Sequence, residues 1–218
     1  MAVLLSIAYF PPISYFALIA KGFAFSGPDR DVEPSVVYIE AHENYQKQTW
    51  RNRFRFYAAD GPQILNFPIV HESRHPIPIT EVKVDYKTPW VVRTERAIDS
   101  AYESAAFFEH YRDELFSILD SHPETLFELD IQIIRFILRK TGIPADLRLT
   151  EGYGLPGGCE DYRELIHPKR PDTVLEDLGL QKPYFQVFAR KYGFVANLSI
   201  LDLLFNEGPD SILYLKRL

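Results

Sequence analysis

The sequence of 218 residues has little sulfur and no long apolar run. Its single cysteine excludes an intramolecular disulfide, and sparse cysteine is typical of a reducing compartment, so we expect a cytoplasmic protein. The apolar stretch at residues 2–20 is interrupted by Pro11, Pro12 and several hydroxyl-bearing side chains, and no charged segment precedes it. We therefore expect neither a signal peptide nor a membrane span.

Basic residues are also scarce. The 24 Lys and Arg residues are outnumbered by 30 Asp and Glu residues, which gives a formal net charge of −6. A nucleic-acid-binding protein usually carries a basic face, so no nucleic acid is expected as a partner. Hydrophobic residues make up 46% of the chain, and we find no internal repeat or low-complexity linker. A single domain over residues 1–218 is therefore expected.

The first forty residues are typical of an α/β fold. Residues 3–8 are predicted as a buried strand, and residues 13–21 as a helix that ends at Gly22. Further strands are predicted at residues 36–40, 63–70, 79–86 and 147–149. We expect an α/β fold with a mixed or mostly parallel sheet flanked by helices, distantly similar to nucleotide-binding folds. Such sheets bind ligands at the carboxyl ends of their strands.

Two capping boxes predict the main helices. Ser100 with Glu103 predicts a helix that runs to residue 120, and Ser121 with Glu124 predicts a second that runs to residue 141 and is closed by Gly142.

Familiar catalytic patterns are missing. The loop GYGLPGG at residues 152–158 lacks the Lys-Ser/Thr pair of a phosphate loop and the spacing of a dinucleotide fingerprint, so a mobile loop is expected there. Cys159 has no nucleophile signature around it. The two histidines of HESRHPIP (residues 71–78) lie in an extended segment, so no metal site is predicted. These residues name no reaction and no cofactor.

Polar and aromatic side chains are concentrated in HENYQKQTWRNR (residues 42–53). In an extended chain, Trp50, Asn52 and Phe54 share one face while Arg51, Arg53 and Arg55 share the other. Arginine binds carboxylate or phosphate through paired hydrogen bonds, so this segment could form the wall of a ligand site. It could equally be a charged edge strand, or its arginines could pair with acidic residues.

A second polar group is set among apolar residues near the C-terminus. Gln186, Asn197 and Asp202 each need a hydrogen-bonding partner if they are buried, and that partner is either protein or ligand. The protein alternative is an internally satisfied Gln186, with Asn197 or Ser199 capping a short helix that ends at Gly208.

The chain resembles the WbqC-like protein family over almost its whole length, in a compact form with a shorter region between Gly142 and Pro183. The matching pieces are residues 9–16 (YFPPISYF), 42–48 (HENYQKQ), 50–53 (WRNR), 100–111, 168–169, 184–188, 193–194 and 197–206. Members of this family occur in gene clusters for O-antigen and other surface polysaccharides, and a glycine-transferring role on sugars has been suggested for some. The resemblance implies a transferase of surface-polysaccharide biosynthesis, with glycyl or acyl transfer to a sugar.

Under this resemblance, His42 is predicted as the catalytic base, because an imidazole changes charge near neutral pH. Arg51 or Arg53, together with Asn52, would hold a phosphate. The predicted ligand-binding residues are Tyr9, Tyr15, Trp50, Asn52, Arg53, Gln186 and Asn197. Expected partners are a small-molecule sugar or nucleotide-sugar and the enzymes of polysaccharide synthesis. The alternative is a non-catalytic sugar- or nucleotide-binding accessory protein of the same pathway.

Overall fold

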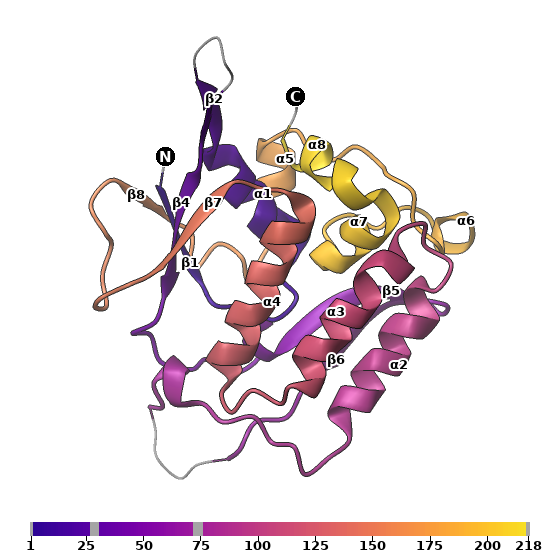
Figure 1. Ribbon diagram of the computed structural model, residues 1–218, viewed down its shortest axis with the longest axis horizontal. Coiled ribbons are helices and arrows are strands. Elements are labelled where there is room, and N and C mark those ends of the chain that lie inside the picture. Colours follow the sequence, from indigo (N-terminus) through magenta and orange to yellow (C-terminus); the bar gives the residue numbers. More distant parts are fainter. Residues whose placement is uncertain (1, 27–30, 72–75, 217–218) are drawn as a thin grey trace.

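Four parallel strands form the central sheet of the computed structural model, which describes residues 2–26, 31–71 and 76–216 (Figure 1). The strands are β1 (Ala2–Ser6), β4 (Ser35–Glu40), β7 (Ala145–Leu149) and β8 (Cys159–Asp161). Their order across the sheet is β7-β4-β1-β8, and all three pairings are parallel. The predicted α/β class with a parallel sheet is therefore confirmed.

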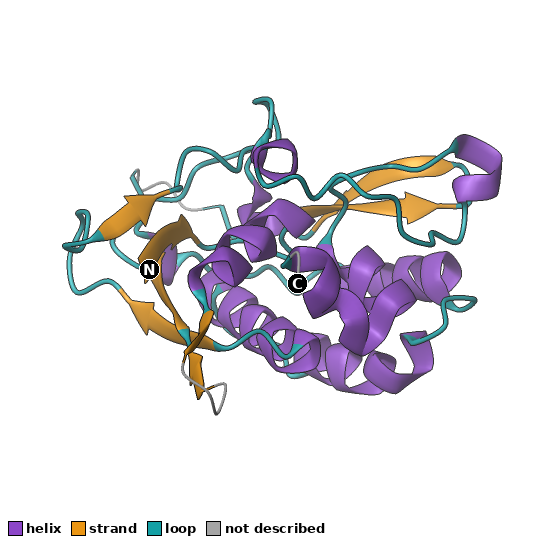
Figure 2. Cartoon of the chain, turned by 90° about the horizontal axis from the view of Figure 1, so that it is seen from above, coloured by secondary structure: helices purple, strands orange, loops and turns teal. Residues whose placement is uncertain are grey.

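One face of the sheet packs on the hydrophobic core. Val3, Leu5, Val37 and Ile39 are fully buried there, as expected where alternate side chains of a strand point to one face. Helices α1 (Ile13–Gly22) and α4 (Leu126–Thr141) lie on the same side of the sheet, as Figures 1 and 2 show. Residues 150–158 join β7 to β8 through turns and bends instead of a helix.

The remaining elements surround this unit. Helices α2 and α3 lie beside the β5–β6 hairpin, and the short helices α5, α6, α7 and α8 follow β8 (Figure 1). The bounds are β2 (Ala24–Ser26), β3 (Asp31–Glu33), β5 (Arg53–Ala58), β6 (Gly61–Asn66), α2 (Trp90–Tyr102), α3 (Phe108–Asp120), α5 (Val174–Asp177), α6 (Ala189–Tyr192), α7 (Ile200–Glu207) and α8 (Ser211–Leu215), with 3-10 turns η1 (Trp50–Asn52), η2 (Ile79–Glu81) and η3 (Gly208–Asp210).

Both predicted capping boxes are misplaced. Ser100 lies inside α2, and the chain turns before α3 because the Phe107 amide donates to the Phe205 carbonyl at 2.9 Å. The true capping box is formed by Thr125 and Glu128 at the start of α4. Residue 122 precedes Pro123 and has a φ of 49°, which excludes a helix that begins at residue 121.

The strand predicted at residues 79–86 is also wrong. Residues 79–81 form the 3-10 turn η2, and with the described residues the segment forms the isolated bridges Ile69–Val84 and Lys83–Thr125 instead of a ladder. The strand predicted at residues 63–70 is shifted: β6 covers residues 61–66 and ends before Pro68, which has no amide hydrogen for a ladder.

Candidate functional site

The strand order of the sheet reverses between β1 and β8. The chain passes from β1 to β4 to β7 in one direction and then returns across the sheet to β8 on the other side of β1. In open parallel sheets, ligands bind outside the carboxyl ends of the strands at this reversal point. A ligand site is therefore expected between the segments that leave β1, β4 and β8.

Two neighbouring hollows lie at this edge of the sheet and share the lining residues Gln46, Arg163 and Glu164. The inner one has a volume of about 20 Å³, enough for a water molecule. The outer one has a volume of about 470 Å³, within the range of small-molecule sites. We call the outer hollow the sheet-edge pocket; it is lined by His42, Glu43, Asn44, Gln46, Tyr153, Asp161, Arg163 and Glu164.

A buried ion pair forms the floor between the two hollows. Arg51 donates from Nε to Glu43 Oε1 at 3.0 Å and from Nη2 to Glu43 Oε2 at 2.5 Å. Ser6, the last residue of β1, donates its hydroxyl to Glu43 Oε2 and accepts from Arg51 Nη2, both at 3.0 Å. Both charged side chains are only 6% exposed. The predicted alternative that an arginine of this segment pairs with an acidic residue thus describes Arg51.

A second buried carboxylate lies at the end of β4. Glu40 is fully buried and accepts from Arg163 Nη1 at 2.7 Å, from the Thr150 hydroxyl at 2.9 Å and from the His42 amide at 2.8 Å. Arg163 also holds Asp161 through Nε and Nη2. Three strand ends are therefore tied together by Glu40.

The imidazole of His42 is fixed in one tautomer. Its Nε2 lies 3.1 Å from the carbonyl oxygen of Thr150. A carbonyl oxygen only accepts hydrogen bonds, so Nε2 carries the hydrogen and Nδ1 is the basic nitrogen of the neutral ring. This exposed ring lines the sheet-edge pocket, in a geometry that suits a general base.

A second imidazole, His167, lines the inner hollow. Its Nδ1 accepts from the Lys169 amide at 3.1 Å, so a neutral His167 carries its hydrogen on Nε2. Burial, followed by the charge of Arg170, lowers the pKa of His167 below its usual value. A neutral ring with a free N–H can donate a hydrogen bond to an oxygen of a ligand.

The charge of the sheet-edge pocket is negative overall. Glu43, Asp161 and Glu164 line it, and Arg163 is the one Lys or Arg among the described residues of its wall. The two arginines of this edge, Arg51 and Arg163, are each already bonded to buried carboxylates. The pocket therefore suits a hydroxylated ligand or one with an ammonium group better than a phosphate.

The start of α1 is closed to a phosphate. A helix that follows the first strand of a nucleotide-binding fold usually offers its N-terminal amides to the ligand. Here the Ile13 amide donates to the Leu198 carbonyl and the Ser14 amide to Asn197 Oδ1, both at 2.9 Å. Asn197 also donates to Asp172, which accepts the Ser14 hydroxyl at 2.6 Å. In the structure, the predicted ligand residue Asn197 therefore caps α1.

The segment at residues 50–53 is not uniformly extended as expected. Trp50–Asn52 forms η1, and β5 begins at Arg53. This turn directs Arg51 and Trp50 to the inner hollow, whereas Asn52 and Arg53 line a different hollow beside the hairpin. The two arginines therefore cannot act together on one anion.

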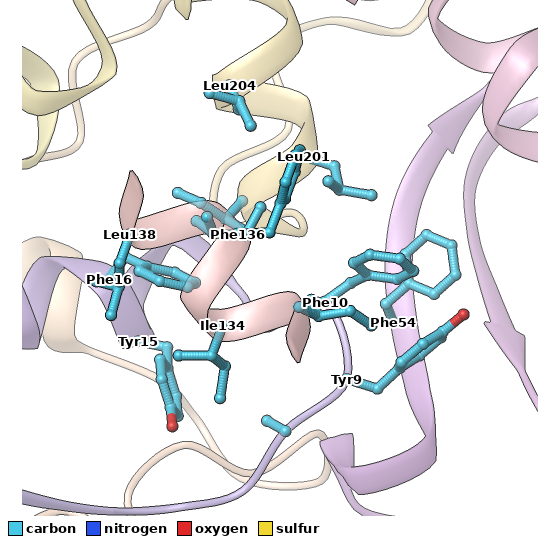
Figure 3. Packing of buried hydrophobic residues seen from close by; sticks show 14 of the residues in the cluster. Tyr9, Phe10, Tyr15, Phe16, Phe54, Ile134, Phe136, Leu138, Leu201 and Leu204 are labelled. Carbon is cyan, nitrogen blue, oxygen red and sulfur yellow. The ribbon is translucent and has the colours of Figure 1, made fainter. Parts of the chain in front are cut away.

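The predicted aromatic residues have different environments. Tyr9 is 1% exposed and packs against Phe10, Phe54 and Phe67 with ring centroids 4.3 to 5.6 Å away, so its buried ring argues against stacking on a ligand (Figure 3). Tyr15 donates its hydroxyl to the Ser6 carbonyl at 3.1 Å and lines the inner hollow together with Trp50.

The remaining predicted residue, Gln186, satisfies its amide within the protein. It exchanges hydrogen bonds of 2.9 Å with the backbone of Val195 and donates to Asp202 at 2.8 Å. Tyr184 donates to the same Asp202 oxygen at 2.5 Å. Burial raises the pKa of Asp202 to about 6. This cluster fixes the segment before α7, which is capped by Ser199 as predicted.

Four residues of the sheet edge escaped prediction: Glu40, Thr150, Arg163 and His167. The position of Glu40 at the end of an apolar strand was the one available signal, because the other three become neighbours of β4 and β1 only through the sheet. Cys159 lies on β8, where burial raises the pKa of its thiol. Among the described residues, which omit 72–75 of the HESRHPIP segment, no group of three or more His, Cys, Asp or Glu side chains is arranged to hold a metal.

Comparison with known proteins supports the family resemblance. The model of the WbqC-like protein family matches residues 8–167, which include the carboxyl ends of β4, β7 and β8 and the loop that leaves β1. The chain belongs to the WbqC-like protein family. Within the curated proteins, this WbqC-like chain is 28% identical over 230 residues to "Uncharacterized protein Rv1507c" of Mycobacterium tuberculosis (strain ATCC 25618 / H37Rv), an alignment that covers 95% of the chain and 94% of that protein.

No solved structure matches the WbqC-like chain significantly. In the part of the chain that the structure describes, no helix is long and apolar enough to cross a membrane.

Proposed function

We propose that this WbqC-like protein transfers an acyl group, of which glycyl is the best candidate, to a sugar of a surface polysaccharide at the sheet-edge pocket. The observation that carries the proposal is the His42 ring, held by Thr150 in the tautomer whose Nδ1 can take a proton. The acidic lining of the pocket adds support, because an activated glycine and an amino sugar both carry an amino group.

In the proposed reaction, the acceptor hydroxyl or amine attacks the carbonyl carbon of an activated glycyl donor, such as a thioester or the mixed anhydride of an acyl phosphate or adenylate. His42 Nδ1 takes the proton of the attacking group. The tetrahedral intermediate then collapses, the bond to the leaving group breaks, and the leaving group departs with the electron pair. The Nε2–H of His167, which lines the adjoining inner hollow, is a candidate donor to the developing oxyanion.

The test is a transfer assay with glycyl thioester or glycyl adenylate as donor and a panel of amino sugars and nucleotide-sugars as acceptors, read by mass spectrometry. Loss of a general base typically slows a reaction by about 10²- to 10⁴-fold. His42→Gln is the most informative variant, because the glutamine amide can still donate to the Thr150 carbonyl but cannot act as a base. His110→Gln on the exposed face of α3 is the matched control and should react at the wild-type rate.

If His42→Gln transferred the glycyl group at the wild-type rate, His42 would not be the general base. The competing function is a non-catalytic sugar- or nucleotide-binding protein, favoured by the observation that every charged side chain at the floor of the site is already paired. A thermal-shift screen separates the two functions, since a ligand that binds the folded state raises Tm. An enzyme responds to donor and acceptor, whereas a binding protein responds to one class and yields no product.

A further inference from the structure

A hollow beside the β5–β6 hairpin has the opposite charge to the sheet-edge pocket. Its volume is about 330 Å³, and it is lined by Lys47, Arg53 and His71 together with the amide side chains of Gln48, Asn52 and Asn66. Among the described residues that line it, none is Asp or Glu. We call it the Arg53 pocket. It is separate from the sheet-edge pocket, although the loop at residues 45–49 contributes to both.

The cations of the Arg53 pocket have no counter-charge in the described part of the chain. Arg51, two residues earlier, is bonded to Glu43, but Arg53 and Lys47 are members of no ion pair among the described residues. The Nε of Arg53 is buried and has no hydrogen-bond partner there. A buried donor of this kind is rare in proteins and calls for a partner.

The backbone holds Arg53 and Asn52 in place without a ligand. Arg53 pairs with Asn66 at the open end of the hairpin. The Asn52 carbonyl accepts from the Phe67 amide at 3.1 Å, and its Nδ2 donates to the Phe67 carbonyl at 2.9 Å. Asn52 is 7% exposed, and its Oδ1 is buried without a partner in the described residues. A pocket that already holds an unpaired donor, Arg53 Nε, and an unpaired acceptor, Asn52 Oδ1, in place costs little conformational entropy when a ligand binds.

We propose that the Arg53 pocket binds the phosphate group of a phosphorylated sugar. Two cationic side chains and an imidazole reach it from three different segments, an arrangement that suits an anion with several oxygens, and arginine binds phosphate through paired hydrogen bonds. The amides of Gln48, Asn52 and Asn66 can bind sugar hydroxyls, and the volume lies in the range of small-molecule sites. This site does not depend on the transfer reaction proposed above.

The experiment measures binding of inorganic phosphate, glucose 1-phosphate, glucose and acetate to the whole chain by isothermal titration calorimetry at constant ionic strength. Glucose 1-phosphate should bind more tightly than inorganic phosphate, and glucose and acetate more weakly than both. Charge-assisted hydrogen bonds that are lost with Arg53 should weaken binding of glucose 1-phosphate in Arg53→Gln by about tenfold or more. Arg53→Lys should lie between this variant and the wild type, because it keeps the charge and loses the planar fork.

Arg55→Gln is the matched control. Arg55 lies on the same strand and the same face as Arg53, but it does not line the pocket, so its variant should bind as the wild type does. The proposal is overturned if glucose 1-phosphate does not bind, if Arg53→Gln binds it as tightly as the wild type, or if acetate binds as well as phosphate. None of these outcomes tests the proposed role of His42 as a general base, which the separate transfer assay measures.

Discussion

Buried carboxylates are stabilised in two different ways in this protein. At the sheet edge, Glu40 and Glu43 are each bonded to an arginine, Arg163 and Arg51. In the C-terminal part, the carboxylate of Asp202 is bonded to the neutral groups of Tyr184 and Gln186. The first arrangement surrounds a pocket with fixed charges, whereas the second keeps a carboxyl inside an apolar region.

The two arrangements have different consequences for stability. Removing one member of a buried ion pair leaves the other charge without a partner, which costs far more than the loss of an exposed pair. A carboxyl that is held by neutral donors instead makes stability depend on pH, because burial favours its protonated form. Asp130 on α4 differs from both arrangements: its oxygens have no partner in the described residues, and burial raises its pKa well above the usual value.

Among the substitutions considered, Arg51→Met is expected to lower the free energy of unfolding the most. Among the described residues, the Glu43 carboxylate would keep the Ser6 hydroxyl as its one partner, and we expect a loss of about 3–5 kcal/mol in the free energy of unfolding, measured by urea denaturation. Arg139→Met, which removes an exposed pair with Glu114, is the control and should cost far less. The double variant Glu43→Met/Arg51→Met should recover part of the loss. If Arg51→Met costs no more than the control, the sheet-edge charges do not stabilise the fold.

The second prediction concerns Asp202→Asn. With a folded-state pKa of about 6 against 3.8 for the free side chain, the folded protein holds a proton between about pH 4 and 6 that the unfolded chain has lost. Stability of the wild type therefore falls as the pH rises through this window and levels off above it. Since one pKa unit corresponds to about 1.4 kcal/mol, the wild type should lose about 3 kcal/mol relative to Asp202→Asn.

The free energies of unfolding of the wild type and of Asp202→Asn, measured by urea denaturation at several pH values between 4 and 7, check this prediction. The amide oxygen that replaces the carboxylate in Asp202→Asn can still accept from Tyr184 and Gln186, so the variant should fold. Parallel stability curves for the two proteins across the window would contradict the prediction.

The smallest change in the free energy of unfolding is expected from Thr150→Val. The Thr150 hydroxyl donates to Glu40 at 2.9 Å and accepts from the Ala41 amide at 3.0 Å. Valine has nearly the same shape, so the loss of about 1–3 kcal/mol should reflect the unpaired amide and the weakened Glu40 network. Because Thr150 also holds His42 through its backbone carbonyl, the tautomer should survive. A wild-type free energy of unfolding would show that Arg163 and the His42 amide satisfy Glu40 without the Thr150 hydroxyl.

Much of the local structure could be predicted from sequence because it depends on neighbouring residues. The strand–loop–helix start, the helix ended by Gly142 and the helix capped by Ser199 follow from apolar periodicity and capping chemistry. The predictions of secondary structure were wrong where contacts between residues far apart in the chain determine the local conformation. The helix predicted from residue 100 is divided because Phe107 bonds to Phe205, almost a hundred residues away in the chain.

The candidate site was only half predictable for the same reason. His42 and Trp50 lie in a conspicuous polar segment, and both line hollows at the sheet edge. That Arg51 faces Glu43 while Arg53 faces another hollow depends on the turn η1, which periodicity did not reveal.

The sequence by itself determined the class of fold, the family and the chemical types available, because apolar patterns and short motifs are local properties. Only the tertiary structure decided which of those groups meet. The parallel sheet brings together the ends of β1, β4, β7 and β8, so that residues 6, 40, 150 and 163 become neighbours. It also sets that Arg51 is paired with a carboxylate whereas Arg53 has no ion-pair partner among the described residues, since charge pairing depends on distance in space.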